Sequence, residues 1–153
     1  MTAQNPTASP QGPSWFQILP PAFTHMLTGA DNAIEQITEV PTLTIPYAGV
    51  WQISYGAHKN FALPGAGTIL LHTLLHKNGV AIPGTEAVTG YKTPSGAGFQ
   101  ATDGQTVLHT FAAQDRVTLH AYRSGGFTTA QVSITNGDGG STGIAAHYVS
   151  PGF

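Results

Sequence analysis

The sequence has no cysteine, and only 8% of its 153 residues are charged. The absence of cysteine excludes a disulfide framework and any thiolate site. An ordinary soluble domain carries about 25% charged residues, so this chain depends for its solubility on Thr, Ser, Gln, Asn and Gly. Such a composition is typical of a β-rich particle whose surface is partly covered by copies of itself.

The scarcity of basic residues excludes two classes of partner. The formal net charge is -2, and the basic residues are Lys59, Lys77, Lys92, Arg116 and Arg123. They are too few and too scattered to follow a phosphate backbone or to hold an anionic surface, so we expect no nucleic-acid and no membrane partner. No apolar run approaches the ~20 residues that span a bilayer. The first residues also lack the basic and apolar parts of a secretory signal, which predicts synthesis in a cytoplasm.

The sequence is rich in turn-forming residues, with 19 glycines and 11 prolines, which argues against long helices. In residues 43–57, LTIPYAGVWQISYGA, large apolar residues alternate with smaller or polar ones, the pattern of a half-buried strand. Pro46 removes a backbone donor and Gly49 permits an unusual backbone angle, so we expect this strand to enter its sheet through a bend.

Further strands follow along the chain. Residues 68–82 predict a hairpin with an Asn-Gly turn. Residues 106–122 predict two strands joined at Ala-Gln-Asp, and residues 130–135 and 143–150 predict two more. Residues 83–105 are rich in Gly, Pro, Thr and Ser and favour a long loop with one short strand. Seven or eight strands without an amphipathic helix predict a sandwich or a barrel.

The chain divides into an N-terminal arm, residues 1–21, and a single domain, residues 22–153. Residues 1–14 are too polar to fold alone. The arm ends in an apolar cluster that requires burial, either on its own domain or in a neighbouring molecule. We expect it to dock on a partner through Trp15, Phe16, Ile18 and Leu19.

Four segments carry a recognisable pattern in order: Pro46, Gly49, Trp51, Ile53 and Ser54, then Lys77, Asn78 and Gly79, then Asp115, Val117 and Leu119, and the closing segment STGIAAHYV. Together they resemble the complement globular-head and tumour-necrosis-factor superfamily of jelly rolls over about residues 34–150. The chain departs from the family's pattern at Gln114, where the family has a glycine, and in a closing strand that lacks the family's phenylalanine. It also has no collagen-like stalk.

The resemblance implies an all-β jelly-roll β-sandwich that forms a homotrimer around a three-fold axis and binds proteins or glycans through exposed loops. A lone domain of this kind would leave several C-terminal aromatic and apolar residues partly unburied, and three-fold packing would cover them. The expected interface residues are Tyr122, Tyr148, Val149 and Phe153.

One motif carries a possible catalytic reading. The run Gly139 to Gly143 around Ser141 fits a nucleophile elbow, which needs a serine between a strand and a helix with an acid and a histidine after it. Here a strand-like segment follows, and no acid lies between Ser141 and His147. We interpret the run as a glycine-rich turn and expect no enzymatic activity.

The histidines and carboxylates offer weak metal sites. His72 and His76 are spaced for a helical zinc site, but on a strand they are about 13 Å apart. One histidine per subunit at a three-fold axis would still bind a metal by symmetry, and His72, His109, His120 and His147 lie on expected strands. The alternative is that they are uncharged surface or interface residues. We expect no metal and no cofactor.

Two acidic features complete the candidates. Asp31 with Glu35 forms a possible carboxylate pair, which we interpret as a solvated segment. Asp138 lies in a glycine-rich run, but the spacing matches no calcium loop.

These features favour a structural or binding protein of a bacteriophage virion, first of all a capsid decoration protein. A tail-associated receptor-binding head and a free bacterial lectin-like module that binds carbohydrate or protein remain alternatives. The expected partners are further copies of the chain, other virion proteins such as the major capsid protein, and a host-surface glycan or protein.

Overall fold

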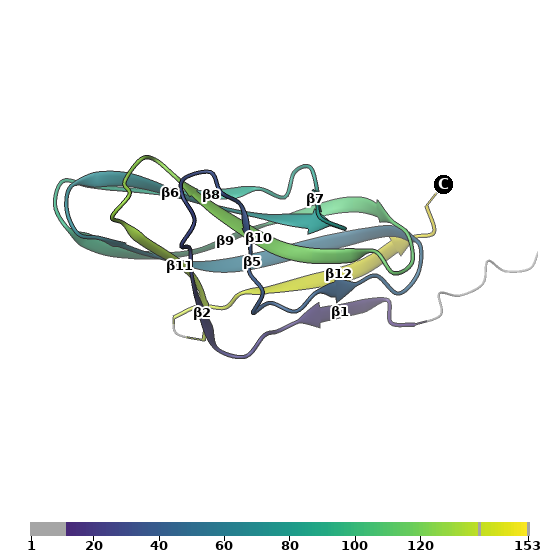
Figure 1. The fold of residues 1–153 in the computed structure, drawn as a ribbon. Coiled ribbons are helices and arrows are strands. Elements are labelled where there is room, and N and C mark those ends of the chain that lie inside the picture. Colours follow the sequence, from purple (N-terminus) through teal and green to yellow (C-terminus); the bar gives the residue numbers. More distant parts are fainter. Residues whose placement is uncertain (1–11, 138, 153) are drawn as a thin grey trace, which may run out of the picture.

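A computed structural model describes residues 12–137 and 139–152, which form two antiparallel sheets packed face to face (Figure 1). Within these residues no helix is long and apolar enough to cross a membrane. Sheet A contains β1 (Trp15–Ile18), β2 (Phe23–Met26), β5 (Gly49–Leu63), β9 (Ala97–Phe111), β11 (Gln131–Asn136) and β12 (Gly143–Ser150). Sheet B contains β3 (Glu35–Gln36), β4 (Leu43–Thr44), β6 (Gly67–Lys77), β7 (Val80–Ala81), β8 (Ala87–Thr93) and β10 (Arg116–Ser124).

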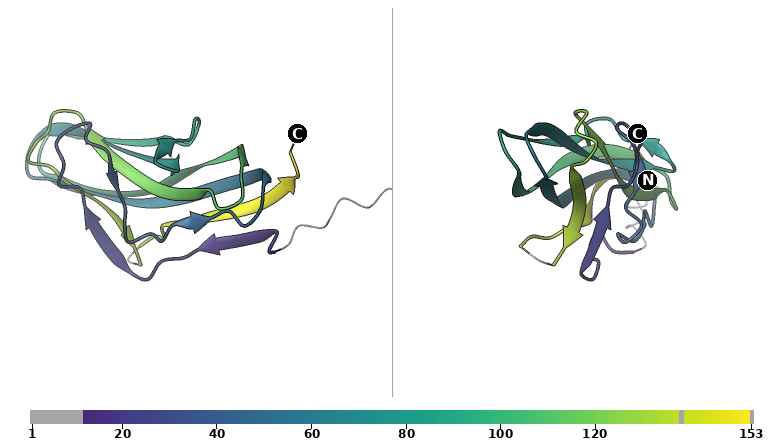
Figure 2. Two further views of the ribbon diagram at one scale, coloured as in Figure 1. Left: turned by 45° about the vertical axis from the view of Figure 1, so that its right-hand side comes forward. Right: turned by 60° about the vertical axis from the view of Figure 1, so that its left-hand side comes forward.

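The long strand β5 organises sheet A. On one side it pairs with β9 along its whole length, from Gly49 opposite Phe111 to Leu63 opposite Ala97. On the other side it pairs first with β12 and then with β11. The tips of the β5–β6 and β8–β9 hairpins gather at the end of the sandwich that lies away from the end of β12 (Figures 1 and 2).

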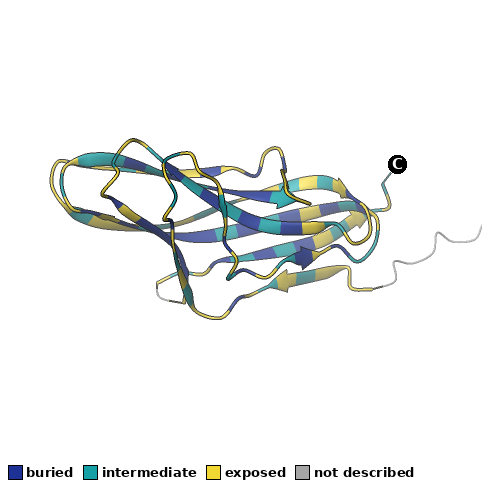
Figure 3. Ribbon diagram, viewed as in Figure 1, coloured by how far each residue is buried: buried dark blue, intermediate teal, exposed yellow. Residues whose placement is uncertain are grey.

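The core lies between the two sheets because alternate residues of each strand face inward (Figure 3). Trp51 and Ile53 of β5 are fully buried, as are Leu71 and Leu75 of β6. Removing these side chains from water is the main force that holds the sheets together. The bend at the start of β5 depends on Gly49, whose φ is +152° and whose added Cβ would lie 2.5 Å from the carbonyl oxygen of Ser150.

Several sequence-based expectations are confirmed. Asn78 and Gly79 form the turn after β6 with φ angles of 50° and 85°, which suits a type I′ turn. The strands β9 and β10 are joined through Gln114, which takes the left-handed conformation, with φ at 71°, where the resembling family has glycine. Its backbone N–H donates to the carbonyl oxygen of Ile45 at 2.7 Å.

The expectation of a long loop over residues 83–105 is wrong. β8 pairs with β6 across this segment, and the first half of β9 pairs with β5. β9 is an edge strand, and much of its length is exposed on both faces. Burial therefore does not select apolar residues at alternate positions, so the period-two pattern is missing from the sequence although the strand is there.

The sheet begins within the segment that the sequence assigns to the arm. Residues 15–18 form β1, which pairs with β12 from Trp15 opposite His147 to Ile18 opposite Ile144.

A buried lysine, paired with an aspartate of its own sheet, links the two sheets. Lys59 of β5 is fully buried, and its Nζ lies 2.8 Å from Oδ1 of Asp103 on β9. The same Nζ donates to the carbonyl oxygens of Leu71 and Ala87, each at 3.1 Å, and to Oγ1 of Thr89 at 3.3 Å. Burial lowers the pKa of Lys59, and Asp103 opposes that effect. One ammonium group thus ties sheet A to β6 and β8 of sheet B.

We predict that Asp103→Asn destabilises the fold by about 3–5 kcal/mol, because it leaves the Lys59 ammonium buried without its counter-charge. The double variant Lys59→Met with Asp103→Asn removes both charges and should recover most of the loss. Urea denaturation at neutral pH and one fixed protein concentration measures both. A single variant as stable as the unmodified chain would show that the pair does not hold the sheets together.

Candidate functional site

The distribution of charge distinguishes the two sheets. The six strands of sheet A contain two charged residues, Lys59 and Asp103, and these pair with each other inside the sandwich. The outer face of these described strands therefore presents no formally charged side chain. It carries polar, small and apolar residues, among them Gln52, Ser54 and Ala145.

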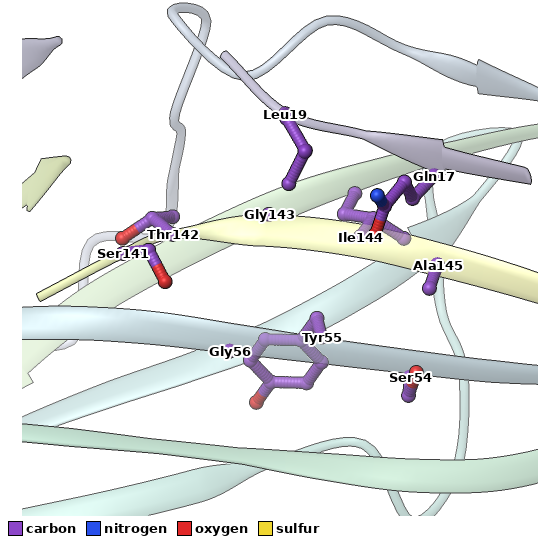
Figure 4. Close-up of a pocket in the computed structure, with 10 residues that line it drawn as sticks. All are labelled: Gln17, Leu19, Ser54, Tyr55, Gly56, Ser141, Thr142, Gly143, Ile144 and Ala145. Atoms are coloured by element: carbon purple, nitrogen blue, oxygen red, sulfur yellow. The ribbon is translucent and has the colours of Figure 1, made fainter. Parts of the chain in front are cut away.

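A cavity of about 220 Å³ opens on this outer face, beside the end of β1 (Figure 4). Its lining is mainly small, with Ser54 and Gly56 from β5 and Ala145 from β12, and Leu19 lies over it. A second hollow of about 180 Å³ lies further along β12, between Trp15, Gln52 and His147. Because their walls contain no Lys, Arg, Asp or Glu, these hollows suit protruding neutral side chains rather than ionic ligands.

Ser141 lines the first cavity, in the turn between β11 and β12. Within the described chain, no histidine or carboxylate forms a hydrogen bond with its hydroxyl. The nearby His58 instead pairs its Nδ1 with Oγ1 of Thr102 at 2.7 Å. An added Cβ at Gly140 would lie 2.3 Å from that Nδ1. The glycines therefore let the turn close over His58, and Ser141 has no activating base.

The structure divides the expected docking cluster between two environments. Phe16 and Ile18 pack against the core, and the Phe16 ring meets Trp51 edge-on at 5.9 Å. Trp15 and Leu19 point away from it and are 56% and 68% exposed. Burial on the domain itself accounts for the first two, and the other two remain available to a partner.

The expected interface residues do not share one face. Tyr148 packs edge-on against Trp51 at 5.4 Å, and Val149 beside it is 49% exposed. Tyr122 lies on the outer face of sheet B, where its ring stacks on His72. Phe153 lies outside the described residues. Their role in a trimer stays a prediction.

The candidate metal ligands also lie apart from one another in the structure. In the described residues no three His, Asp or Glu side chains come together as a metal site. Asp31 pairs with Arg123 at 3.2 Å, whereas Glu35 pairs with His25 at 3.0 Å, so the two carboxylates have different partners. Asp138 lies outside the described residues.

A stacked histidine pair lies on the outer face of sheet B. The rings of His76 and His120 are 3.7 Å apart and nearly parallel. Burial, and then the neighbouring His76, lower the pKa of His120 to about 4, and burial lowers the pKa of His76. Both rings are therefore neutral at neutral pH.

Comparison with known proteins concerns the fold. No protein-family model and no curated protein matches the chain. Among solved structures it is similar to the Eiger TNF from S. frugiperda, with 9% identity over 91% of this chain and 94% of that chain, and a TM-score of 0.51. The fold is a TNF-like jelly roll. At this identity the likeness shows the fold alone, and it confirms the expected all-β jelly-roll sandwich.

The jelly roll should lose stability in acid through His120. Its folded pKa is about 4 and the ordinary value is 6.5, so between these values the unfolded chain binds more protons. Stability therefore falls as the pH decreases through this window. We predict that His120→Gln reduces this acid-dependent loss by about 1–3 kcal/mol. Urea denaturation at neutral pH and at about pH 4.5 measures the difference. An equal loss of stability in acid for the unmodified chain and for His120→Gln would contradict this prediction.

Proposed function

We propose that the protein is a homotrimeric binding component of a larger particle, with the outer face of sheet A as the contact between subunits. The observation that carries the proposal is the absence of formal charge from that face. Charged residues are depleted at the centres of protein interfaces, because burying them costs hydration energy. Most of the charged residues outside the Lys59–Asp103 pair lie on sheet B or in the connections, as Lys77, Glu86 and Arg116 do.

Protruding and recessed features on the face support a second copy as the occupant. Leu108 on the edge strand β9 is 63% exposed on this face. Full burial of such a side chain contributes about 1.5–3 kcal/mol. The two neutral hollows, with Ser54 and Ala145 among their walls, offer space for side chains of a neighbouring subunit.

The particle we propose is a bacteriophage virion, with capsid decoration as the role. The low charge of the chain and the polar arm that leads to the exposed Trp15 and Leu19 support this proposal. The arm would attach each trimer to another virion protein, such as the major capsid protein, and three arms per trimer would add their affinities.

The virion proposal predicts that the chain is found by mass spectrometry in density-purified phage particles. It should be present there in many copies, as a decoration protein is. If the chain is present in the lysate but consistently absent from such particles, the virion proposal is contradicted. The proposed trimer is not affected by that result.

The subunit contact predicts a particle of three times 15.9 kDa in light scattering. Leu108→Glu places a charge on the proposed interface and should convert the trimer to monomers. Val80→Glu is the matched control, because Val80 is 70% exposed on β7 of sheet B and lies off the proposed contact. A stable monomer at micromolar concentration, or equal effects of the two substitutions, would contradict the proposed contact.

A further inference from the structure

Three side chains form a hydrogen-bonded row on the outer face of sheet B. His72 lies on β6, Ser124 ends β10, and Glu86 immediately precedes β8. The Nδ1 atom of His72 lies 3.0 Å from Oε1 of Glu86, and its Nε2 lies 2.8 Å from Oγ of Ser124. Both distances fall in the range of about 2.6–3.2 Å that a nucleophile, its base and an orienting group require.

The chemistry of the row fixes the imidazole tautomer. An ionised carboxylate only accepts hydrogen bonds, so Nδ1 of a neutral His72 carries the proton and donates it to Glu86. Nε2 then holds a lone pair and accepts the hydroxyl proton of Ser124. This is the order of atoms in a serine–histidine–acid triad, in which the base takes the serine proton at Nε2.

Tyr122 holds the imidazole and the carboxylate in place. Its ring stacks on His72 with 4.2 Å between centroids and 10° between planes, and its hydroxyl donates to Oε1 of Glu86. The hydrogen bond from Tyr122 lowers the pKa of Glu86, which favours the ionised form. Burial and the contact with Glu86 raise the pKa of Tyr122 to about 12, so the phenol remains a donor.

The row is partly exposed to solvent. The side chains of His72 and Glu86 are 14% and 46% exposed. Ser124 is followed by Gly125 and Gly126, and an added Cβ at Gly126 would meet nothing within 4 Å. The N–H of Gly126 donates to Oδ2 of Asp31, which holds the loop in position. Because the row lies on the outer face of a sheet, an accepted acyl group lies at the surface.

We propose that Ser124, His72 and Glu86 form a hydrolytic triad that cleaves small, exposed carboxylic esters. Ser124 is the nucleophile, His72 the general base and acid, and Glu86 a positioning residue. The activity is additional to the proposed binding function. It lies on the outer face of sheet B, whereas the proposed subunit contact lies on the outer face of sheet A and does not include Tyr122, so either proposal can fail without the other.

The reaction balances with water as the co-reactant. Oγ of Ser124 attacks the ester carbonyl carbon as its proton passes to Nε2 of His72. The bond to the alcohol oxygen then breaks, and that oxygen takes the proton from His72. Water attacks the acyl-serine, again giving a proton to His72, and release of the carboxylic acid restores Ser124.

The first experiment uses the full chain and a fluorophosphonate probe, which forms a bond from Oγ to phosphorus and releases fluoride. Intact mass and peptide mapping should place one adduct on Ser124 at neutral pH. Ser141→Ala is the matched control and should label normally, because Ser141 has no activating base. An unlabelled wild-type protein would overturn the proposal, and this result does not depend on the folding of any variant. A label that persists in Ser124→Ala would overturn it as well.

The second experiment measures hydrolysis of p-nitrophenyl acetate. Ser124→Ala and His72→Gln should each lower the rate by about tenfold or more, because each removes the paired nucleophile and base. Ser141→Ala should keep the wild-type rate. Equal rates in the wild type and Ser124→Ala would mean that scattered surface imidazoles do the hydrolysis, and would overturn the proposal.

Glu86→Gln tests the positioning role. The amide can donate to Nδ1 and so permit the tautomer that protonates Nε2. The labelling rate at Ser124 should fall and its pH dependence should change, while the melting temperature stays close to that of the wild type. An unchanged rate and pH profile would remove Glu86 from the triad.

Discussion

The pairing of β5 on both of its edges is the constraint on which the rest of the molecule depends. Because β9 holds one edge and β11 and β12 hold the other, β5 cannot slip by one residue without turning its apolar side chains outward. The register that buries Trp51 and Ile53 also places Lys59 inside. The register of β5 therefore both buries Lys59 and keeps its charge off the outer face of sheet A.

Much of this arrangement is readable from the sequence, because burial on one face leaves a period-two pattern. The alternation that begins at Trp51 and Ile53 continues through Tyr55 and Ala57 to Lys59, and the structure shows that this lysine keeps the same parity and faces inward. The β9 strand left no such pattern, because an edge strand exposed on both faces accepts glycine, threonine and glutamine. In β8 burial does alternate, but threonines occupy inward positions and Val88 faces outward, so the apolar pattern is lost. The turn at Asn78 was predictable, since its conformation is local.

The candidate sites were harder to predict because their members come from distant segments. The run around Ser141 resembles a nucleophile elbow because of its glycines, but these glycines only allow the tight turn between β11 and β12. Ser124, His72 and Glu86 are separated along the chain, and only the registers of β8, β6 and β10 bring them together. A single sequence contains no signal for such cross-strand neighbours. A face without charge on one sheet and a hydrogen-bonded polar row on the other give the molecule two chemically distinct sides.

The position of β9 at the rim of sheet A has a further consequence for the isolated subunit. Within the described chain β9 pairs only with β5, so its other edge presents backbone donors and acceptors over a strand of 15 residues. Its sequence has no proline, and its one charged side chain, Asp103, is turned inward. Proteins commonly protect such an edge with outward lysines, prolines or a covering element, because it can template the addition of foreign strands. We therefore expect a subunit without a neighbour on β9 to be prone to aggregation through this edge.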